Sequence, residues 1–523
     1  MLRPSYRLAR AGLVLAVAGC GTTVPLAQQG NGSNPQDAFG GSATASTSGS
    51  GGVGAGAGSS TGSRVGGTSG QVAAGSSSTG SAGPGLPTSG SGGAVVPGVN
   101  GVGVTASTLD VGVLYFKNYD QANADNGGKS VTGGDLLADA KIVVADINAH
   151  GGVAGRRLVP HYVGYDRTSS MPAAAQDQAA CTQLTQDTKV FAVMGTGLTP
   201  TLKACVEKAG GIVIGTEILK DSQSTYRTYP HFFDVQAIDT ERFAQSLVNV
   251  LVRQKWGSGW NAATGGPSSA AANVGIITYD TPALRAAVKV LLPSLRTAGL
   301  KATDDNVVYI NQPESTADNG PAASAVQGAM LRFRQHGVDH LVVADTNGAM
   351  TQLIMTVAET QRYYPRYAVG SGSGLEAYLE GGLISPEQVR GVVGLGWLPM
   401  LDLSPASNPD TGPYSNPVRR NCLALMKRGG QRFTSSNAKS IALLYCDQFG
   451  FLRDVLAPAK GRSVNREAFL AAVNGLGTRF TSASLGLTSF SNSKHDAVAR
   501  AWAWEYAATC SCMRYVGPAE SVR

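Results

Sequence analysis

Two strand-to-turn-to-helix joints within residues 109–215 constrain the fold of this chain more than any other feature. The first joint follows the apolar segment 109–114, and the second follows the apolar segment 190–194. In an open α/β sheet, ligands bind outside the carboxyl ends of the strands, where the following helices begin. The hydroxyls of Thr199 and Thr201, beside the free N–H groups of a helix start, are therefore predicted to contact an anionic group of a ligand.

The rest of the chain repeats this alternation of strands and helices. Apolar periodicity predicts strands at 109–114, 158–165, 190–194, 212–214, 274–279, 306–310, 339–344 and 367–370. Helices are predicted between them at 134–150, 172–187, 200–209, 239–255, 282–298, 321–335 and 349–362. Such alternation predicts parallel sheets with right-handed crossovers, and two successive series predict two similar lobes.

The remaining segments carry weaker signals. The insert 257–272 is interpreted as a mobile surface loop. Helices are predicted at 417–428, 437–456 and 465–474. Near the end, 485–490 and 499–506 are interpreted as two strands joined by the turn 492–496.

The N-terminus has the composition of an export signal. Arg3, Arg7 and Arg10 precede an apolar run at 11–18 that is too short to span a bilayer. The following Gly19-Cys20 completes a segment that resembles a bacterial lipobox, so residues 1–20 are predicted to be a lipoprotein signal peptide. A lipidated Cys20 would hold the protein on the outer face of the cell membrane.

Residues 21–107 are rich in Gly, Ser, Thr and Ala, and they hold many of the chain's 68 glycines. Such a segment cannot bury enough apolar surface to offset the entropy lost on ordering, so a disordered tether is predicted. Three of the seven net positive charges lie in the leader, and no basic block occurs elsewhere. A nucleic-acid partner is therefore not expected.

Six cysteines follow the leader, and an even number in an exported chain indicates disulfides. Six cysteines allow fifteen pairings. Closeness in sequence favours Cys181–Cys205 and Cys422–Cys446. Cys510 and Cys512 are then left to each other, which is an awkward geometry within a strand. A metal site at these two cysteines has little support, because no histidine or further cysteine lies nearby.

No catalytic motif is present. Gly372 stands where a G-x-S-x-G nucleophile would require serine, and neither a G-x-G-x-x-G after a strand nor a P-loop lysine motif occurs. His336 and His340 have a ligand-like spacing, but Gly337 between them indicates a break from helix to strand. We expect both to be exposed loop histidines. The sequence therefore predicts no enzyme, no cofactor and no metal.

A resemblance to a known family rests on several of these segments. Residues 146–158 read DINAHGGVAGRRL, which is similar to a helix end and "DIN-x-x-GG-x-x-G" turn of the type I periplasmic binding proteins. The joint at 193–195, the Gly-Val-Asp entry to a strand at 337–339 and the segment 486–490 add support. The closest group is the branched-chain amino-acid and amide receptors of ABC importers, and the resemblance covers about 108–517.

The resemblance implies an α/β fold of two Rossmann-like lobes joined by a three-strand hinge, the type I periplasmic-binding fold. Lobe 1 would comprise 108–236 and 399–484, and lobe 2 would comprise 237–398 and 485–523. The crossings would fall near 235–239, 398–403 and 485. Solute would be held between the lobes by hinge closure.

Candidate ligand contacts carry over by position. Thr199, Thr201 and Thr216 would come from lobe 1, with Tyr115, Phe116 and Tyr119 on the apolar side of the cleft. Lobe 2 would supply Tyr279, Asp345, Thr346, Asn347, Ser371 and Ser373. Amino-acid receptors carry a glutamate near Ser371 and Ser373, whereas this chain has Glu376 three residues further on. Alternative roles are open, because Thr199 and Asp345 are also good helix caps.

The predicted function is capture of a small polar solute (an amino acid, an amide or a small organic acid) and its delivery to an ABC permease. The alternative is a ligand-sensing receptor subunit that signals to a membrane partner without transport. The sequence has no motif that separates the two.

Overall fold

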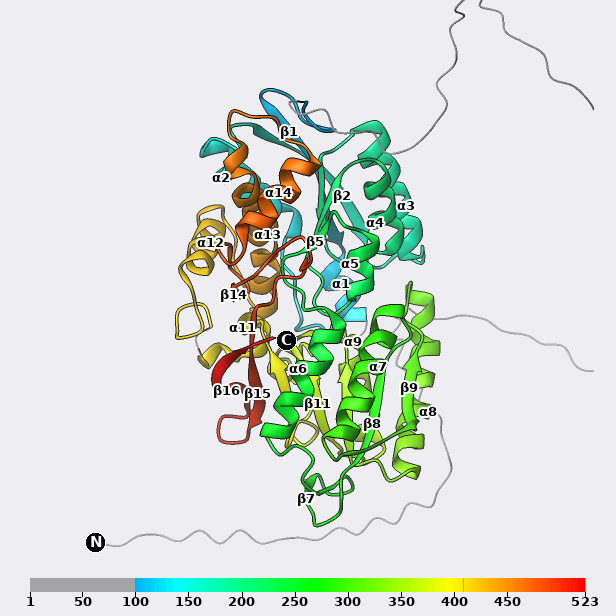
Figure 1. The fold of residues 1–523 in the computed structure, drawn as a ribbon. Coiled ribbons are helices and arrows are strands. Elements are labelled where there is room, and N and C mark those ends of the chain that lie inside the picture. The colour runs from blue at the N-terminus through cyan, green and yellow to red at the C-terminus, as the bar shows by residue number, and fades with distance from the viewer. Residues whose placement is uncertain (1–98, 126, 408, 523) are drawn as a thin grey trace, which may run out of the picture. The chain divides into compact units, whose positions relative to one another are not determined.

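The computed structural model describes residues 99–522 apart from 126 and 408. The predicted signal peptide, Cys20 and the tether up to residue 98 lie outside the described residues. Two sheets organise the described part of the chain (Figure 1). Helices cover both, as the alternation of strands and helices predicts.

The first sheet has the order β2-β1-β3-β4-β5, and all of its pairings are parallel. Its strands are β1 (Thr108–Lys117), β2 (Arg157–Asp166), β3 (Ala192–Gly195), β4 (Ile212–Gly215) and β5 (Phe232–Asp234). Alternate residues of a strand face opposite sides of a sheet. In β3 and β4, Met194 and Ile214 join one core cluster and Val193 and Val213 join another. Both faces of this sheet are therefore buried, as in other parallel sheets.

The second sheet has the order β16-β15-β12-β11-β10-β8-β9. Its strands are β8 (Asn273–Tyr279), β9 (Lys301–Ile310), β10 (His340–Ala344), β11 (Arg366–Gly370), β12 (Val393–Gly396), β15 (Arg500–Ala507) and β16 (Cys512–Ser521). Strands β8 to β12 pair in parallel, and β15 and β16 add an antiparallel edge.

The helices fill the intervals between the strands. They are α1 (Tyr119–Asp125), α2 (Leu136–Ala149), α3 (Ala173–Thr182), α4 (Pro200–Lys208), α5 (Gln223–Thr228), α6 (Thr240–Arg253), α7 (Pro282–Thr297), α8 (Asn319–Gln335), α9 (Ala349–Thr360), α10 (Leu375–Glu380), α11 (Pro399–Asp402), α12 (Pro417–Arg428), α13 (Ser436–Leu456) and α14 (Arg466–Leu476). None of the helices in the described part is long and apolar enough to cross a membrane.

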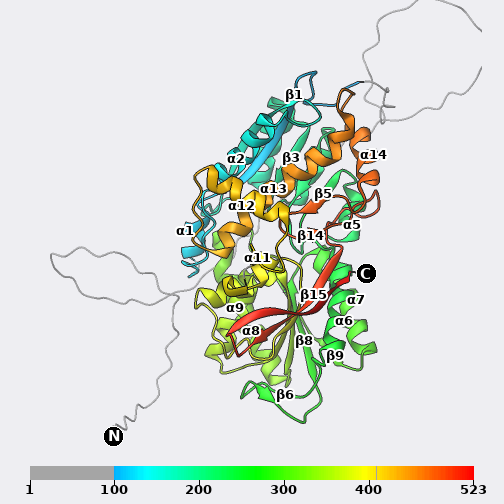
Figure 2. The ribbon, with the colours of Figure 1, turned by 90° about the vertical axis from the view of Figure 1, so that its left-hand side faces the viewer.

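Residues far apart in sequence complete the lobe around the first sheet, which is lobe 1. Helix α13 begins at its N-cap Ser435, whose side chain accepts from the N–H of Ala438. Its apolar face packs with α2, α12 and α14 beside that sheet (Figure 2). The chain therefore builds lobe 1, leaves it to build lobe 2 around the second sheet, and returns. The exact lobe boundaries stay a prediction.

The first and last crossings between the lobes run side by side. Asp234 forms a parallel bridge with Asp496, and the N–H of Val498 donates to the carbonyl of Ala237 at 3.0 Å. Arg242 donates through Nε to Asp239 at 2.5 Å and forms an ion pair with Asp496. The two crossings are thus tied by charge as well as by backbone bonds.

The predicted strand-turn-strand near the C-terminus forms only in part. Isolated antiparallel bridges join 488 to 498 and 491 to 494 around the predicted turn, and β14 (Gly486–Leu487) pairs with β13 (Thr481–Ser482). The pairing predicted for 499–506 is wrong. The hairpin partner of β15 is β16, which the sequence did not predict. The turn between them contains no Gly, Pro or Asn, and Pro518 within β16 is tolerated because β16 is an edge strand.

The insert 257–272 carries a small hairpin of β6 (Trp260–Asn261) and β7 (Gly266–Pro267), where the sequence predicted a mobile surface loop. Trp260 is buried, and its indole N–H donates to the carbonyl of Tyr364 at 2.8 Å. The aromatic side chain thus anchors the insert to lobe 2.

The disulfide pairing favoured by the sequence is confirmed. Cys181–Cys205 joins α3 to α4, and Cys422–Cys446 joins α12 to α13. Cys510 and Cys512 are bonded to each other. The predicted difficulty of that geometry does not arise, because Cys510 lies in the turn before β16 and not within a strand.

Candidate functional site

The predicted ligand contacts follow the carboxyl ends of strands in both lobes. Thr199 and Thr216 follow β3 and β4, while Tyr279, Asp345 and Ser371 end or follow β8, β10 and β11. Segments that follow the outer strands β2 and β9 also meet across the two lobes. The N–H of Ala173 in lobe 1 donates to the carbonyl of Glu314 in lobe 2 at 3.2 Å. The lobes are therefore in contact in this structure.

Two further contacts lie nearer to the predicted site. A Cβ built on Gly372 would lie 3.6 Å from Cγ2 of Ile218, which follows Thr216 by two residues. A Cβ on Gly381, at the end of α10, would collide with the hydroxyl of Ser130 in lobe 1. The loops after β4 and β11 thus come within van der Waals range of each other.

The turn after β3 uses its donors inside lobe 1. Thr199 is the N-cap of α4, and its hydroxyl oxygen accepts from the N–H of Thr201 at 3.2 Å, with Pro200 at the first helical position. The N–H of Thr199 donates to Asp177 at 2.9 Å, and its hydroxyl donates to the same carboxylate oxygen. Tyr165 donates to the other oxygen of Asp177.

The backbone N–H of the preceding residue, Leu198, also has a hydrogen-bond partner within the protein. The N–H of Leu198 donates to Oε1 of Glu217 at 2.8 Å, and Lys220 donates to the carbonyl of Leu198 at 2.7 Å. Thr216 is buried, and its hydroxyl lies 3.4 Å from the carbonyl of Gly195. The protein's own carboxylates therefore occupy donors of Leu198 and Thr199 that the sequence assigned to an anionic ligand.

The carboxylate of Asp345, which follows β10, accepts hydrogen bonds from residues just after it in the chain. One carboxylate oxygen accepts from the N–H groups of Thr346 and Asn347, and the other accepts from the N–H and hydroxyl of Thr351. Burial raises the pKa of Asp345 although these hydrogen bonds lower it. Asn347 is exposed, and its side chain accepts from Ala349 at 3.2 Å.

The serines after β11 differ from each other. The hydroxyl of Ser371 donates to Asp402 in α11 at 2.8 Å and accepts from the N–H of Trp397 at 2.8 Å. It therefore fastens β11 to the second crossing. The hydroxyl of Ser373 is buried and has no hydrogen-bond partner among the described residues. Of the two hydroxyls, that of Ser373 is therefore the one left without a hydrogen-bond partner in the described part of the chain.

Glu376 is turned toward the edge of the second sheet. Its carboxylate accepts from the N–H of Met513 in β16 at 2.8 Å. Burial raises the pKa of Glu376 to about 7, so much of it is protonated near neutral pH. In this arrangement Glu376 supports the hairpin and is not placed as a free negative charge.

Aromatic side chains lie where the loops of the two lobes meet. Phe116 covers the turn after β3, since a Cβ on Gly197 would lie 2.9 Å from its Cζ. Phe116 and Tyr119 have ring centroids 6.2 Å apart, and the guanidinium carbon of Arg167 lies 4.9 Å from the Phe116 centroid. Tyr115 is half-buried and packs against the main core cluster.

Tyr378 in α10 is a candidate site residue that was not predicted from the sequence. Burial raises its pKa, with Asp345 and Tyr119 as the neighbouring charged or titratable groups. The pKa of Tyr279 is raised by burial too, with Asp345 and Tyr378 near it. Tyr378 thus lies within electrostatic range of Tyr119 of lobe 1 and of Tyr279 of lobe 2. A helix predicted to begin after Gly374 would have contained Tyr378, and this was the signal available in the sequence.

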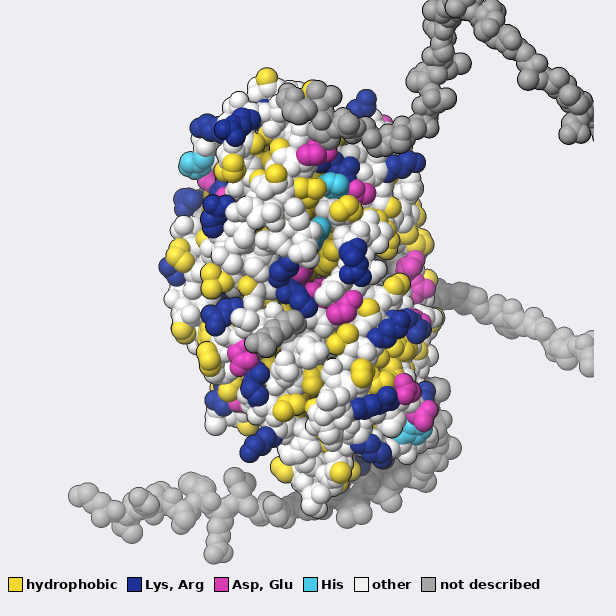
Figure 3. All heavy atoms as spheres, viewed as in Figure 1, with side chains coloured by type: hydrophobic (Ala, Val, Ile, Leu, Met, Phe, Trp, Pro, Cys, Tyr) yellow, Lys and Arg dark blue, Asp and Glu magenta, His cyan; other side chains and the backbone are white. Residues whose placement is uncertain are grey.

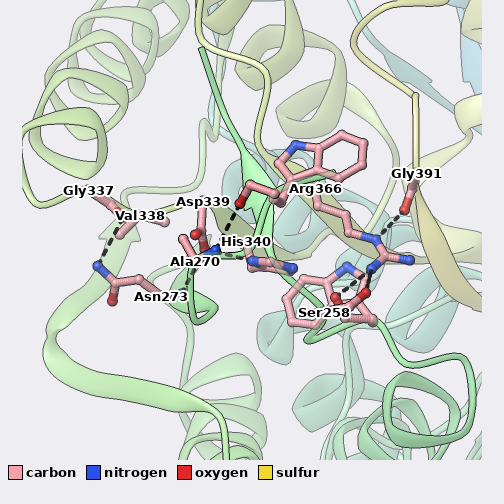
Figure 4. Close-up of polar contacts among 12 residues, drawn as sticks. Ser258, Ala270, Asn273, Gly337, Val338, Asp339, His340, Arg366 and Gly391 are labelled. Carbon is pink, nitrogen blue, oxygen red and sulfur yellow. Dashed lines mark hydrogen bonds and ion pairs between the residues drawn. The ribbon is translucent and has the colours of Figure 1, made fainter. Parts of the chain in front are cut away.

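A surface cavity of about 410 Å³ lies at the other end of the second sheet. Asp339 lines this cavity and precedes β10, whereas Asp345 of the predicted site follows β10. Asp339 accepts from the N–H of Asn273 at 2.7 Å and from the ring of His340 at 2.6 Å (Figure 4). Arg366 donates to carbonyls of the loop before β6. These contacts hold the insert in place.

The expectation that His340 is an exposed loop residue is wrong. It is the first residue of β10 and fully buried, and its ring meets that of Trp256 edge-on with centroids 4.7 Å apart. Gly337 does break the chain between α8 and β10, but β10 is a central strand, so its first side chain enters the core. Within the described ranges, no group of three His, Cys, Asp or Glu side chains is placed to hold a metal ion.

The surface charge has no concentrated basic region on the face shown in Figure 3, where Lys and Arg side chains are scattered among acidic and uncharged ones. A nucleic-acid surface would gather cations along one groove or helix. This face offers no such array.

Comparison with known proteins agrees with the geometry. The sequence model described as "Periplasmic binding protein" matches residues 122–509. No curated protein matches the chain. Among solved structures, a solute-binding protein of an ABC transporter from Rhodopseudomonas palustris HaA2, in complex with p-hydroxybenzoic acid, has a TM-score of 0.55 at 16% identity. The match covers 80% of this chain and 98% of that one.

Two other structures have the same fold. The branched-chain amino acid transporter substrate-binding protein LivJ from Streptococcus pneumoniae, in complex with isoleucine, is 18% identical with a TM-score of 0.51, and the match covers 79% of this chain and 100% of that one. A fatty acid ABC transporter substrate-binding protein from Thermomonospora curvata is 14% identical with a TM-score of 0.54, covering 81% and 95%. At these identities the likeness concerns the fold.

Proposed function

Since the chain belongs to the type I periplasmic binding protein family, we propose that it captures a small solute between its two lobes and delivers it to an ABC importer. The observation that carries this proposal is the meeting of the loops after β4 and β11, where Ile218 approaches Gly372. Loops at the carboxyl ends of parallel strands are where α/β folds bind ligands. Contact between two such sets of loops fits a closed state.

Closure about the crossings gives the protein two distinguishable states. A solute that contacts both lobes binds the closed state more tightly than the open one, so it shifts the population toward closure. An importer that docks on both lobes can then distinguish loaded from empty protein. The short crossings, tied to each other by Arg242 and Asp496, are suited to such a hinge.

The solute class in this proposal is an amino acid, an amide or a small organic acid. Solved structures with this fold hold p-hydroxybenzoic acid in one case and isoleucine in another, each a small molecule with an apolar body. Phe116, Tyr119, Tyr279 and Tyr378 would contact such a body. The unpartnered hydroxyl of Ser373 would bind a polar group of the solute.

We further propose that Cys20 is lipidated and holds the protein at the outer face of the membrane. The support is the sequence of the leader, in which three arginines precede a short apolar run that ends at Gly19-Cys20. Mass spectrometry of the protein expressed with its leader in a lipoprotein-processing bacterium tests this. Cleavage before Cys20 with an added diacylglyceryl mass is expected, and an unmodified Cys20 would contradict it.

A wedge between the lobes tests the closure itself. Gly381 has φ −78°, a backbone conformation open to any residue, and a Cβ there would collide with Ser130 of the opposite lobe and lie 3.2 Å from the carbonyl oxygen of Ala377. Gly381→Leu should hold the lobes apart and increase the radius of gyration in small-angle X-ray scattering. Gly328→Leu is the control, because no atom lies within 4 Å of a Cβ at that position of α8.

A thermal-shift screen then tests solute binding. Amino acids, amides, small organic acids and aromatic acids are added to wild-type protein and to both variants. A solute that stabilises the wild-type protein and the Gly328→Leu variant but not the Gly381→Leu variant would support the proposal. A solute that stabilises all three equally would place binding outside the cleft and overturn it. At a hundredfold excess over Kd, stabilisation is about 2.7 kcal/mol.

A further inference from the structure

The disulfide Cys510–Cys512 lies in the turn between β15 and β16, where the antiparallel ladder ends at the pair Ala507 and Cys512. Residues 508–511 are exposed, and Cys512 is half-buried. Ser511 between the two cysteines has φ +51°, a left-handed conformation in which a side chain is unfavourable. The disulfide therefore stands at the tip of a hairpin, open to solvent, in a turn with a strained residue.

The other two disulfides have different surroundings. Cys181 and Cys422 are each 4% exposed, and their partners Cys205 and Cys446 are half-buried, so neither bond has an exposed cysteine. Each bond joins two helices across a sequence separation of 24 residues. A thiol must reach a sulfur atom to reduce a disulfide, and exposed or strained disulfides are the labile ones. Cys510–Cys512 differs from these two disulfides because Cys510 is exposed and because Ser511 beside it has a left-handed backbone.

We propose that Cys510–Cys512 is a thiol–disulfide exchange site, which accepts electrons from a thiol-bearing reductant while the other two disulfides stay oxidised. The reductant's thiolate attacks Sγ of Cys510, and the S–S bond breaks with its electron pair passing to Sγ of Cys512. A second thiol of the reductant attacks the mixed disulfide and releases Cys510. The two cysteine thiolates take up protons from water, and the reductant leaves as a disulfide.

The hairpin keeps its structure when this bond opens. Strand β16 is held by its ladder with β15, by the hydrogen bond from Met513 to Glu376, and by the hydroxyl of Tyr515, which donates to Asp402 at 2.5 Å. Sγ of Cys510 lies 3.5 Å from the carbonyl of Ala507, so the thiol formed by reduction has an acceptor in place. The two thiols thus remain close together and can re-form the bond.

Selective reduction tests the proposal on the full chain under native conditions. The protein is incubated with graded glutathione, a monothiol, or dithiothreitol, a dithiol, then quenched with acid and alkylated with N-ethylmaleimide. Peptide mass spectrometry reads each cysteine separately, with Cys181–Cys205 and Cys422–Cys446 as internal controls. We expect Cys510 and Cys512 to be alkylated about tenfold faster or more than either control pair. Equal rates, or slower alkylation of Cys510 and Cys512, would overturn the proposal.

A pair of variants tests the order of attack. Cys512→Ser leaves a single thiol at Cys510, which should form a mixed disulfide with oxidised glutathione on the peptide that contains residue 510. Cys510→Ser leaves the half-buried Cys512, whose adduct should form more slowly. Circular dichroism confirms that both variants are folded. If neither residue forms an adduct in folded protein, the turn does not exchange with thiols and the proposal fails.

Discussion

The N–H and the hydroxyl of Thr199 both donate to one carboxylate oxygen of Asp177, and the N–H lies 2.9 Å from it. Asp177 is fully buried in α3, so a carboxylate of the protein itself fills the turn that the sequence assigned to an anionic ligand. The bond also connects two helices that Cys181–Cys205 joins covalently. Thr199 is thereby part of the internal structure of lobe 1.

Thr199→Ala should lower the free energy of unfolding by about 1–2 kcal/mol, because it removes an N-cap and a bond to a buried carboxylate. Urea denaturation followed by circular dichroism measures the change. Thr201→Ala is the matched control and should cost less, since the hydrogen bonds described for this turn use the N–H of Thr201 and not its hydroxyl. Equal losses in the two variants would contradict the role given to Thr199.

Asp139→Asn should change the pH dependence of stability. Asp139 is fully buried in α2, and neither carboxylate oxygen has a partner within the described part of the chain. Burial, with a smaller effect of Asp135, raises the pKa of Asp139 from 3.8 to about 7. The folded protein then binds the proton more tightly than the unfolded chain, so stability falls as pH rises from about 4 to about 7.

Wild-type protein should therefore lose roughly 3 kcal/mol of stability between pH 5 and pH 8 relative to Asp139→Asn. Calorimetric melting at pH 5 and pH 8 measures the difference. Asp187→Asn, at an exposed carboxylate, serves as the control. A wild-type protein that is as stable as Asp139→Asn at pH 8 would show that this carboxylate has a partner in solution.

Arg419→Met should destabilise the protein by about 3 kcal/mol or more, because it leaves several buried carbonyls without a donor. Arg419 is fully buried and donates to the carbonyls of Pro409, Tyr414, Ala483 and Ser484 at 2.6–2.9 Å. Burial lowers its pKa to about 10, so it keeps its charge at neutral pH.

Guanidine denaturation measures this loss, and the exposed neighbour Arg420→Met is the control. Arg419→Lys should recover only part of it, because an ammonium group cannot reproduce the planar fork of donors. If Arg419→Met were as stable as Arg420→Met, the hydrogen bonds of Arg419 would not contribute to stability as inferred.

Removing disulfides should cost stability according to the length of chain that each one closes. Replacing Cys181 and Cys205 by Ala should lower the free energy of unfolding by about 3 kcal/mol, and replacing Cys510 and Cys512 by about half as much. The separations are 24 and 2 residues, so the unfolded chain gains more freedom in the first case. Urea denaturation of the two double variants measures both losses. A larger loss for the Cys510 and Cys512 variant would contradict the prediction.

Local pattern alone was enough for the parallel strands and the longer helices that alternate with them. The prediction of a helix at 417–428 matches α12, and the strand at 212–214 lies within β4 (Ile212–Gly215). Helical and strand periods are set by neighbouring residues, and caps such as Thr199 and stops such as Gly210 act within a few positions. For that reason the alternation of elements, and with it the two-lobed α/β fold, could be read before any contact was known.

Long-range pairing could not be read in this way. The sequence paired 499–506 with the wrong segment, because the turn before β16 has no Gly, Pro or Asn and only the neighbouring β12 fixes where β15 lies. His340 was expected to be exposed, yet β8 and β11 enclose its strand. Such placements depend on residues that are distant in the chain.

The candidate site shows the same division. The sequence by itself determined which residues follow the carboxyl ends of the strands, since strand ends and helix starts are local features. Only the tertiary structure decided that Asp177, 22 residues before Thr199, accepts hydrogen bonds from Thr199. It also decided that the carboxylate of Asp345 accepts a hydrogen bond from Thr351. A hydrogen bond forms with whichever partner the packed core brings within reach, and that choice is made when distant elements come together in the fold.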